Sequence, residues 1–155
     1  MAAPTVPAQR IATLSTDSGE AWWWFGGLAL IKVASKQTEG KYSLIEMLWP
    51  PSLEVPLHVH TREDELFYVL EGKIAYRVGD VRAEVSAGHT VFAPRNIPHG
   101  FIVTSPEPAR YLIVYSPSLR RIHPRYEHAC TRPCTAATGH TADARSNRSP
   151  EHSDA

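Results

Sequence analysis

The sequence predicts a single all-β domain of the sandwich or barrel type. About nine short apolar runs follow one another at spacings of roughly eight to twelve residues. No segment between these runs shows the 3.6-residue apolar period of a helix. Gly, Pro and charged residues separate the runs, as expected of tight turns between strands. The chain has 155 residues, which is enough for one hydrophobic core and too few for two.

The N-terminal residues are rich in Pro, Ala, Thr and Ser, and we interpret positions 1–20 as a loose arm with one edge strand near residues 10–14. The first strongly apolar segment follows at Ala21 and contains three tryptophans and a phenylalanine. On a strand, Trp22 and Trp24 would face one side, and Trp23 and Phe25 would face the other side. One pair would pack in the core, and the other would cover a binding cavity or contact a second copy of the chain.

Nine further strands are predicted from β-branched, aliphatic and aromatic residues. They lie at 28–34, 41–48, 55–60, 65–70, 73–78, 82–85, 90–93, 100–104 and 110–115. After residue 117 the chain has few aliphatic residues, too few to offset the entropy of ordering it. We therefore divide the chain into the arm 1–20, a barrel 21–117 and a polar tail 118–155, which we expect to be largely disordered from about residue 128.

The net charge and the distribution of apolar residues limit the classes of partner that we expect. Sixteen basic and sixteen acidic residues give a formal net charge of zero, which argues against nucleic acid or an anionic membrane as the partner. The N-terminus lacks the basic and apolar regions of a secretory signal, and no stretch reaches the roughly 20 apolar residues of a membrane span. We expect a cytoplasmic protein with small-molecule partners.

A candidate metal site lies in the stretch PLHVHTREDELFYVLEG, from Pro56 onward. His58 and His60 are two residues apart, so both side chains would leave the same face of an extended strand. A polar run follows, and we interpret it as a bend that directs Glu65 back toward the imidazoles. His99 is the fourth candidate, because the proline before it fixes how the histidine enters its strand.

Three imidazoles and one carboxylate suit Fe(II), Mn, Co, Ni, Cu or Zn, and this ligand set does not select among these metals. An octahedral ion held by four protein ligands would keep two adjacent positions open, as a catalytic site requires. The predicted cofactor is therefore one divalent transition metal ion, held by His58, His60, Glu65 and His99.

The spacing of these residues resembles that of the cupins. His58-x-His60, then Glu65 after four residues and Gly72 after six more, is similar to the first cupin motif. Gly88, then Pro94 after five residues and His99 after four more, is similar to the second cupin motif. The resemblance covers roughly residues 22–115 and implies a double-stranded β-helix barrel of jelly-roll type with a metal site inside.

Three positions depart from the usual cupin pattern. Ser52 and Ser86 stand where a glycine and a proline are usual, and both positions concern turns. His89 stands where an aspartate is common, and we interpret it as a surface residue of the turn. None of the departures removes a predicted metal ligand.

Within the cupins, the segment around Glu65 and the upstream tryptophans resemble the compact bacterial proteins related to quercetin 2,3-dioxygenase. This resemblance implies a flavonol-like or other aromatic enol or phenol substrate, dioxygen as co-substrate, and Glu65 as the general base. Strand alternation from Glu65 and His99 points four apolar residues into the same cavity. These predicted substrate contacts, which would equally serve as core residues, are Phe67, Val69, Phe101 and Val103.

Two other functions fit the same residues. Small cupins also resemble cyclases and isomerases of aromatic polyketides, in which the metal polarises a carbonyl and no dioxygen is used. A third possibility is a ligand-binding cupin without catalysis. By analogy with many small cupins, we expect a homodimer that pairs through an outer sheet face.

Overall fold

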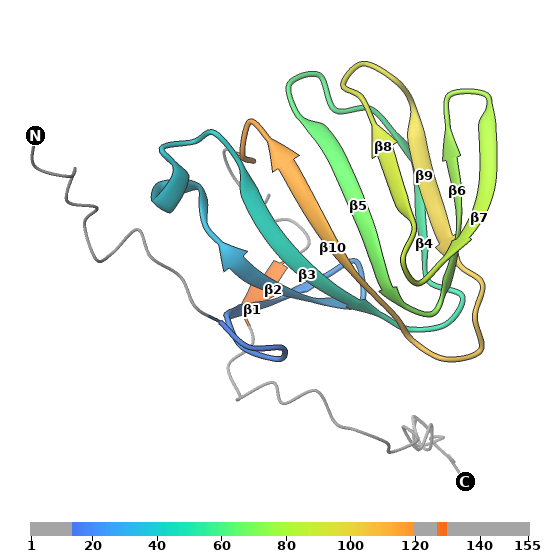
Figure 1. Cartoon of the computed structure of the whole chain (residues 1–155), viewed down its shortest axis with the longest axis horizontal. Helices are drawn as coiled ribbons and strands as arrows, with labels where there is room; N and C mark the ends of the chain where they lie inside the picture. The colour runs from blue at the N-terminus through green and yellow to red at the C-terminus, as the bar shows by residue number, and fades with distance from the viewer. Residues whose placement is uncertain (1–13, 120–126, 130–155) are drawn as a thin grey trace, which may run out of the picture.

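The computed structural model describes residues 14–119 and 127–129, and it confirms the all-β double-stranded β-helix (Figure 1). All strand pairs are antiparallel and form two sheets packed face to face. The larger sheet has the order β11-β1-β2-β3-β10-β5-β8, and the smaller has the order β4-β9-β6-β7. The strands are β1 (Glu20–Trp24), β2 (Gly27–Val33), β3 (Ser43–Trp49), β4 (Glu54–His58), β5 (Asp64–Glu71), β6 (Lys73–Val78), β7 (Val81–Ser86), β8 (Thr90–Ala93), β9 (His99–Val103), β10 (Ala109–Ser116) and β11 (Glu127–Ala129).

The predicted strands between residues 21 and 115 all form, and each end lies within two residues of its predicted position. The only helix in the described residues is one 3-10 turn, η2 (Ser35–Thr38). The prediction for Phe25 was wrong, because β1 ends at Trp24 and Phe25 has a positive φ of 50° in the turn that follows. A left-handed residue cannot continue the alternation of a strand.

The core lies between the two sheets. Alternate residues of each strand face inward, as the period of two requires. Phe67 and Val69 from the larger sheet meet Phe101 and Val103 from the smaller one, and all four are nearly inaccessible to solvent. The rings of Phe67 and Phe101 lie 5.9 Å apart between their centroids. All four residues belong to the hydrophobic core, and their contact with a substrate stays a prediction.

Strand β1 separates its tryptophans as its alternation predicts. Trp22 and Trp24 are partly buried against the core, whereas Trp23 remains 45% exposed. Trp23 is the only one of the three on the outer face of the larger sheet, opposite Leu28 of β2. A contact of this face with a second copy of the chain stays a prediction.

The outer face of the larger sheet carries a buried charge network that the sequence patterns did not reveal. The ammonium of Lys32 lies 2.9 Å from a Glu46 carboxylate oxygen and donates to the backbone carbonyls of Ser15 and Ser18. The other Glu46 oxygen accepts a hydrogen bond from Arg110 at 2.5 Å. Lys32 and Glu46 are both less than a tenth exposed, so each buried charge needs the other to compensate it.

Replacing Glu46 with glutamine is expected to lower the free energy of unfolding by about 3 kcal/mol, because it leaves the buried Lys32 charge uncompensated. Urea unfolding at neutral pH measures the change. The control is Glu84→Gln. Glu84 is about half exposed, and its ion pair with the exposed Lys73 is long, at 4.0 Å. That control is expected to change stability by less than about 0.5 kcal/mol. Equal losses in the two variants would contradict the role assigned to Glu46.

Some predictions fall on residues that the structure does not describe. These are most of the edge strand near residues 10–14, the arm up to residue 13, and most of the tail. Within the tail, residues 127–129 form β11, which pairs with β1. Among the described residues, no helix is both long and apolar enough to cross a membrane.

Candidate metal centre

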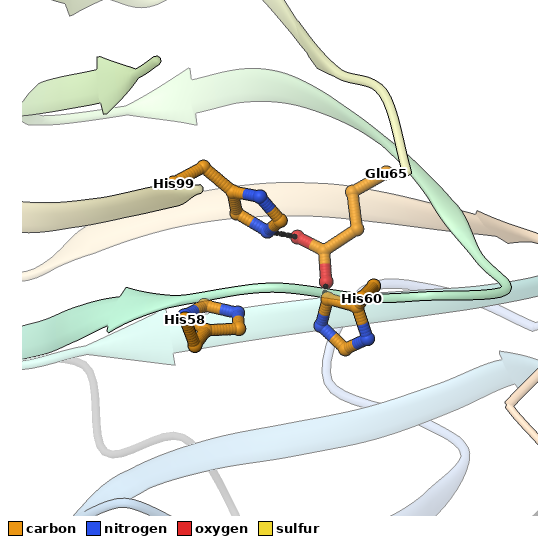
Figure 2. Close-up of side chains that lie close together, drawn as sticks. All are labelled: His58, His60, Glu65 and His99. Atoms are coloured by element: carbon orange, nitrogen blue, oxygen red, sulfur yellow. Dashed lines mark ion pairs between the residues drawn. The ribbon is translucent and has the colours of Figure 1, made fainter. Parts of the chain in front are cut away.

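The four predicted metal ligands come together at one end of the sandwich (Figure 2). Each offers a nitrogen or oxygen atom, and these atoms all lie within 4.8 Å of one another. His58 is the last residue of β4, His99 is the first residue of β9, and Glu65 is the second residue of β5. His60 lies in the segment between β4 and β5. The smaller sheet therefore supplies two ligands and the larger sheet supplies the carboxylate.

Strand pairing fixes the relative positions of the ligands. His58 and His99 are direct partners across the β4–β9 pair, beyond a bulge that follows Val55. The backbone carbonyl of His60 accepts a hydrogen bond from the Asn96 amide at 2.7 Å, which ties its segment to the turn before β9. Asn96 has a positive φ of 64°, a conformation that asparagine tolerates better than most residues. The turn thus holds both His60 and the start of β9.

Asp64 anchors the strand that carries the carboxylate. It accepts hydrogen bonds from the Arg95 backbone amide at 2.9 Å and from the Arg95 guanidinium at 3.0 and 2.7 Å. These hydrogen bonds lower the pKa of Asp64 to about 2. The paired guanidinium joins the start of β5 to the loop before β9, so it fixes Glu65 relative to His99.

Backbone carbonyls orient two of the imidazoles. Nδ1 of His58 lies 2.9 Å from the Pro56 oxygen, and Nδ1 of His99 lies 2.9 Å from the Ile97 oxygen. A carbonyl oxygen only accepts, so Nδ1 carries the hydrogen in both rings. Nε2 is then the free ligand atom of each ring. This is the usual way in which a protein orients a histidine toward a metal.

The contact between His99 and Glu65 favours a cation at the centre of the cluster. Nε2 of His60 lies 2.8 Å from one Glu65 oxygen, and Nε2 of His99 lies 3.4 Å from the other. His99 Nε2 is buried and makes no hydrogen bond. A lone pair that faces a carboxylate is repelled unless a proton or a metal ion lies between them. The ligand set and the unpartnered nitrogen therefore fit a bound transition metal ion.

Charge is distributed unevenly over the cluster. Burial alone would raise the pKa of Glu65, but the interactions with His60 and His99 outweigh it and lower the pKa to about 2. Burial also opposes protonation of His99, yet its contacts with Glu65 and the Ile97 carbonyl raise its pKa. Burial lowers the pKa of His58. At neutral pH Glu65 is ionised and His58 is neutral, which are the forms that bind metal.

Acidification is expected to weaken metal binding. In the metal-free protein the raised pKa of His99 makes a proton on this ring a competitor of the metal, whereas the lowered pKa of His58 makes protonation of that ring a weaker competitor. The apparent affinity should fall about tenfold per pH unit below the pKa of His99, since one proton is displaced. Titration with Co(II) from about pH 5.5 to 8, with calorimetry in two buffers to count released protons, measures this. An affinity independent of pH would contradict it.

Tyr115 is a neighbour of the cluster that strand parity alone did not assign. It is the direct cross-strand partner of Glu65 in the β10–β5 pair, and its ring lies 5.9 Å from the His60 ring. Burial raises the pKa of Tyr115, and the charge of Glu65 and a hydrogen bond to it add to the effect. The hydroxyl therefore stays protonated and holds the carboxylate in place.

A groove of about 510 Å³ lies elsewhere, along the smaller sheet. Leu57, Ala75, Arg77 and Ile102 are among its lining residues, and none of the four clustered ligands is. The candidate metal centre is therefore defined by the cluster and not by this groove.

Comparison with known proteins agrees with the fold and the position of the cluster. Residues 45–115 match the family model described as the cupin domain, and this range contains all four ligands. An uncharacterised protein of Methanocaldococcus jannaschii is 34% identical over 59 residues, which are 38% of this chain. The match spans about half (47%) of that relative.

Solved structures share the architecture. A predicted oxalate decarboxylase of Thermotoga maritima superposes with a TM-score of 0.59 at 21% identity, over 68% of this chain and 97% of that one. The protein KdgF of a Halomonas species gives 0.55 at 21% identity, over 63% and 82%. The polyketide cyclase RemF of Streptomyces resistomycificus gives 0.52 at 25% identity, over 75% and 80%.

Proposed function

Since residues 45–115 match the cupin domain model, we propose that this protein is a metal-dependent dioxygenase for flavonol-like or other aromatic enol or phenol substrates. The observation that carries the proposal is the convergence of three imidazoles and one ionised carboxylate on one point. Four protein ligands leave open positions on an octahedral ion, as a substrate and a co-substrate require.

His58, His60, His99 and Glu65 would hold the ion. When bound, the ion supplies Lewis acidity toward the phenolic or enolic oxygen and the redox chemistry that dioxygen requires. Both atoms of dioxygen enter the products of ring cleavage, so the reaction needs no external reductant.

Glu65 has the second role, as general base. Its carboxylate is ionised at neutral pH and so is able to accept the proton of the substrate hydroxyl. The Tyr115 hydroxyl, hydrogen-bonded to Glu65, orients the carboxylate. Phe67 and Phe101 supply flat apolar surface for an aromatic ring, and Val69 and Val103 extend it.

A second candidate is a non-oxidative cyclase or isomerase of aromatic polyketides. Its support is the likeness to the polyketide cyclase RemF, at 25% identity over three quarters of this chain. The same residues would serve both reactions, with Glu65 moving a proton in each.

Oxygen uptake distinguishes the candidates. Protein loaded separately with a redox-active ion, Fe(II), Mn(II), Co(II), Ni(II) or Cu(II), is expected to consume one dioxygen per flavonol cleaved with at least one of them, and to be inactive without oxygen. The Zn(II) form, which has no redox chemistry, is expected to be inactive. Turnover of an aromatic polyketide at equal rates in air and under anaerobic conditions would support the cyclase instead. Tight binding of these compounds with no turnover by any metal form would contradict both enzymes and favour a binding protein.

A further inference from the structure

Glu63 is a buried carboxylate beside the metal ligands. It directly precedes β5, and it is only 8% exposed. Every second residue from Glu63 to Val69 is buried, whereas the preceding Arg62 is exposed. The alternation of β5 thus begins one residue before the strand and turns Glu63 to the same side as Glu65. A carboxylate is rarely buried unless a partner compensates its charge.

His60 is the partner that the structure gives to Glu63. Nδ1 of His60 lies 3.7 Å from a Glu63 carboxylate oxygen, and among the described residues Glu63 forms no other ion pair. The guanidinium of Arg95, in the loop before β9, is paired with Asp64. The contact between Glu63 and His60 is electrostatic at this distance, and an approach of about 0.5 Å would make it a hydrogen bond.

His60 is the histidine of the cluster that lacks a backbone partner for its ring. His58 ends β4 and His99 begins β9, and Nδ1 of each lies 2.9 Å from a backbone carbonyl oxygen. His60 lies outside the strands, and no backbone carbonyl of residues 14–119 or 127–129 accepts a hydrogen bond from its ring. Its side chain is also 21% exposed, against 2% for His99. The carboxylate of Glu63 stands beside His60 where a carbonyl stands beside each of the other two rings.

The two ring nitrogens of His60 face different carboxylates. Nε2 lies 2.8 Å from Glu65, which is itself a candidate ligand, whereas Nδ1 faces Glu63. Glu63 is not one of the four residues whose ligand atoms gather within 4.8 Å of one another. When Nε2 binds a metal ion, Nδ1 carries the hydrogen, and a carboxylate is a strong acceptor for it. Glu63 would therefore act on the metal through His60 and not as a ligand.

Glu63 also balances the charge of the site. Neutral imidazoles, the form that binds metal, contribute no charge. A divalent ion bound by Glu65 alone would therefore leave one net positive charge in a largely buried place. The carboxylate of Glu63 brings the sum to zero, which lowers the cost of burying the ion.

We propose that Glu63 is a positioning residue, which accepts a hydrogen bond from Nδ1–H of His60, fixes Nε2 as the ligand atom and strengthens the binding of a divalent ion. The inference rests on the metal site of the proposed function and does not depend on the reaction that takes place there. Loss of a carboxylate that orients a ligating histidine typically lowers metal affinity by about 10- to 100-fold.

Two variants of similar size separate the contributions of Glu63. Glu63→Gln keeps an oxygen acceptor for Nδ1–H and removes the charge, whereas Glu63→Leu removes both. Competition with a chelator of known affinity measures Co(II) binding. The affinity of Glu63→Leu is expected to fall about 10- to 100-fold below wild type, with Glu63→Gln between the two. The matched control is Glu54→Leu, which replaces an exposed carboxylate of β4 and should retain the wild-type affinity.

NMR of the Zn(II)-loaded protein observes the ring itself. Long-range ¹H–¹⁵N correlation spectra identify which nitrogen of each imidazole carries the hydrogen. In wild-type protein the hydrogen of His60 is expected on Nδ1, and its exchange with solvent should become faster by about tenfold or more in Glu63→Leu. His58 and His99, which backbone carbonyls orient, should not change. A side chain that only fills space would not cause a change confined to His60.

Two results would overturn the assignment. One is a wild-type His60 ring that carries its hydrogen on Nε2 in the Zn(II) form, which is seen without any variant. The other is wild-type Co(II) affinity in Glu63→Leu together with unchanged exchange of the His60 hydrogen. If the metal-free melting curve shows that Glu63→Leu does not fold, wild-type affinity in Glu63→Gln would overturn the assignment instead.

The same samples distinguish this inference from the proposed function. Wild-type protein that binds neither Co(II) nor Zn(II) would overturn both. Metal-loaded protein with the expected His60 ring, but without turnover of a flavonol or a polyketide, would overturn the proposed function alone. Turnover by wild-type protein together with unaltered metal binding in both Glu63 variants would overturn the positioning role alone.

Discussion

Replacing His99 with alanine is expected to weaken the binding of Co(II) or Zn(II) by more than about 100-fold. His99 is 2% exposed, and its Nε2 is buried and makes no hydrogen bond. Loss of a residue that only orients a ligand typically costs 10- to 100-fold in affinity, so loss of the ligand itself should exceed that range. Metal content after dialysis and competition with a chelator of known affinity measure the effect.

The matched control is His89→Ala. His89 is an exposed residue of the β7–β8 turn whose Nδ1 lies 3.0 Å from the Ser86 carbonyl, away from the cluster. That variant is expected to bind metal as wild type does. Wild-type affinity in His99→Ala would show that the four-residue cluster is not the metal site.

Replacing Glu65 with glutamine is expected to retain bound metal and to lose turnover by about 10²- to 10⁴-fold, the usual contribution of a general base. The amide oxygen still reaches a metal, but an amide does not accept a proton at neutral pH. The three imidazoles remain in place, with His58 and His99 still oriented by backbone carbonyls. Metal analysis and the oxygen-uptake assay, run on the same sample, separate the two effects.

Glu54→Gln provides the comparison, because Glu54 is an exposed carboxylate on β4, four residues before His58. It is expected to leave both metal content and turnover unchanged. Full activity in Glu65→Gln would mean that another group removes the proton. Loss of metal together with activity would mean that Glu65 acts mainly as a ligand.

The strands and the ligand set could be predicted from the sequence because both follow from local patterns. Period-two alternation assigned Phe67 and Phe101 to the interior without knowledge of the partner strand. The spacing from His58 to Glu65 likewise lies within one short stretch of sequence, from the end of β4 to the start of β5. Only His99 required a long-range pairing, and the resemblance of its surroundings to the second cupin motif supplied it.

The residues that the sequence patterns missed depend on registers between distant strands. Tyr115 reaches Glu65 only because β10 pairs with β5 in the observed register. Glu46 pairs with Lys32 of the neighbouring strand, whose ammonium also bonds two carbonyls of the N-terminal segment. Nothing within either strand distinguishes these side chains from solvated ones. Phe25 was misassigned for a related reason, since a turn residue with positive φ has the same apolar character as a strand residue.

The supply of ligands by both sheets has a mechanical consequence. β4 and β9 belong to one sheet and β5 to the other, so an ion at the cluster joins them at one end of the sandwich. Separation of the sheets at that end would require breaking coordination bonds in addition to losing apolar contacts. Bound metal should therefore suppress local opening there and slow amide hydrogen exchange in β4, β5 and β9, with little effect on β2 and β3. A bound ion would thus hold the two sheets together at the end where the four ligands lie.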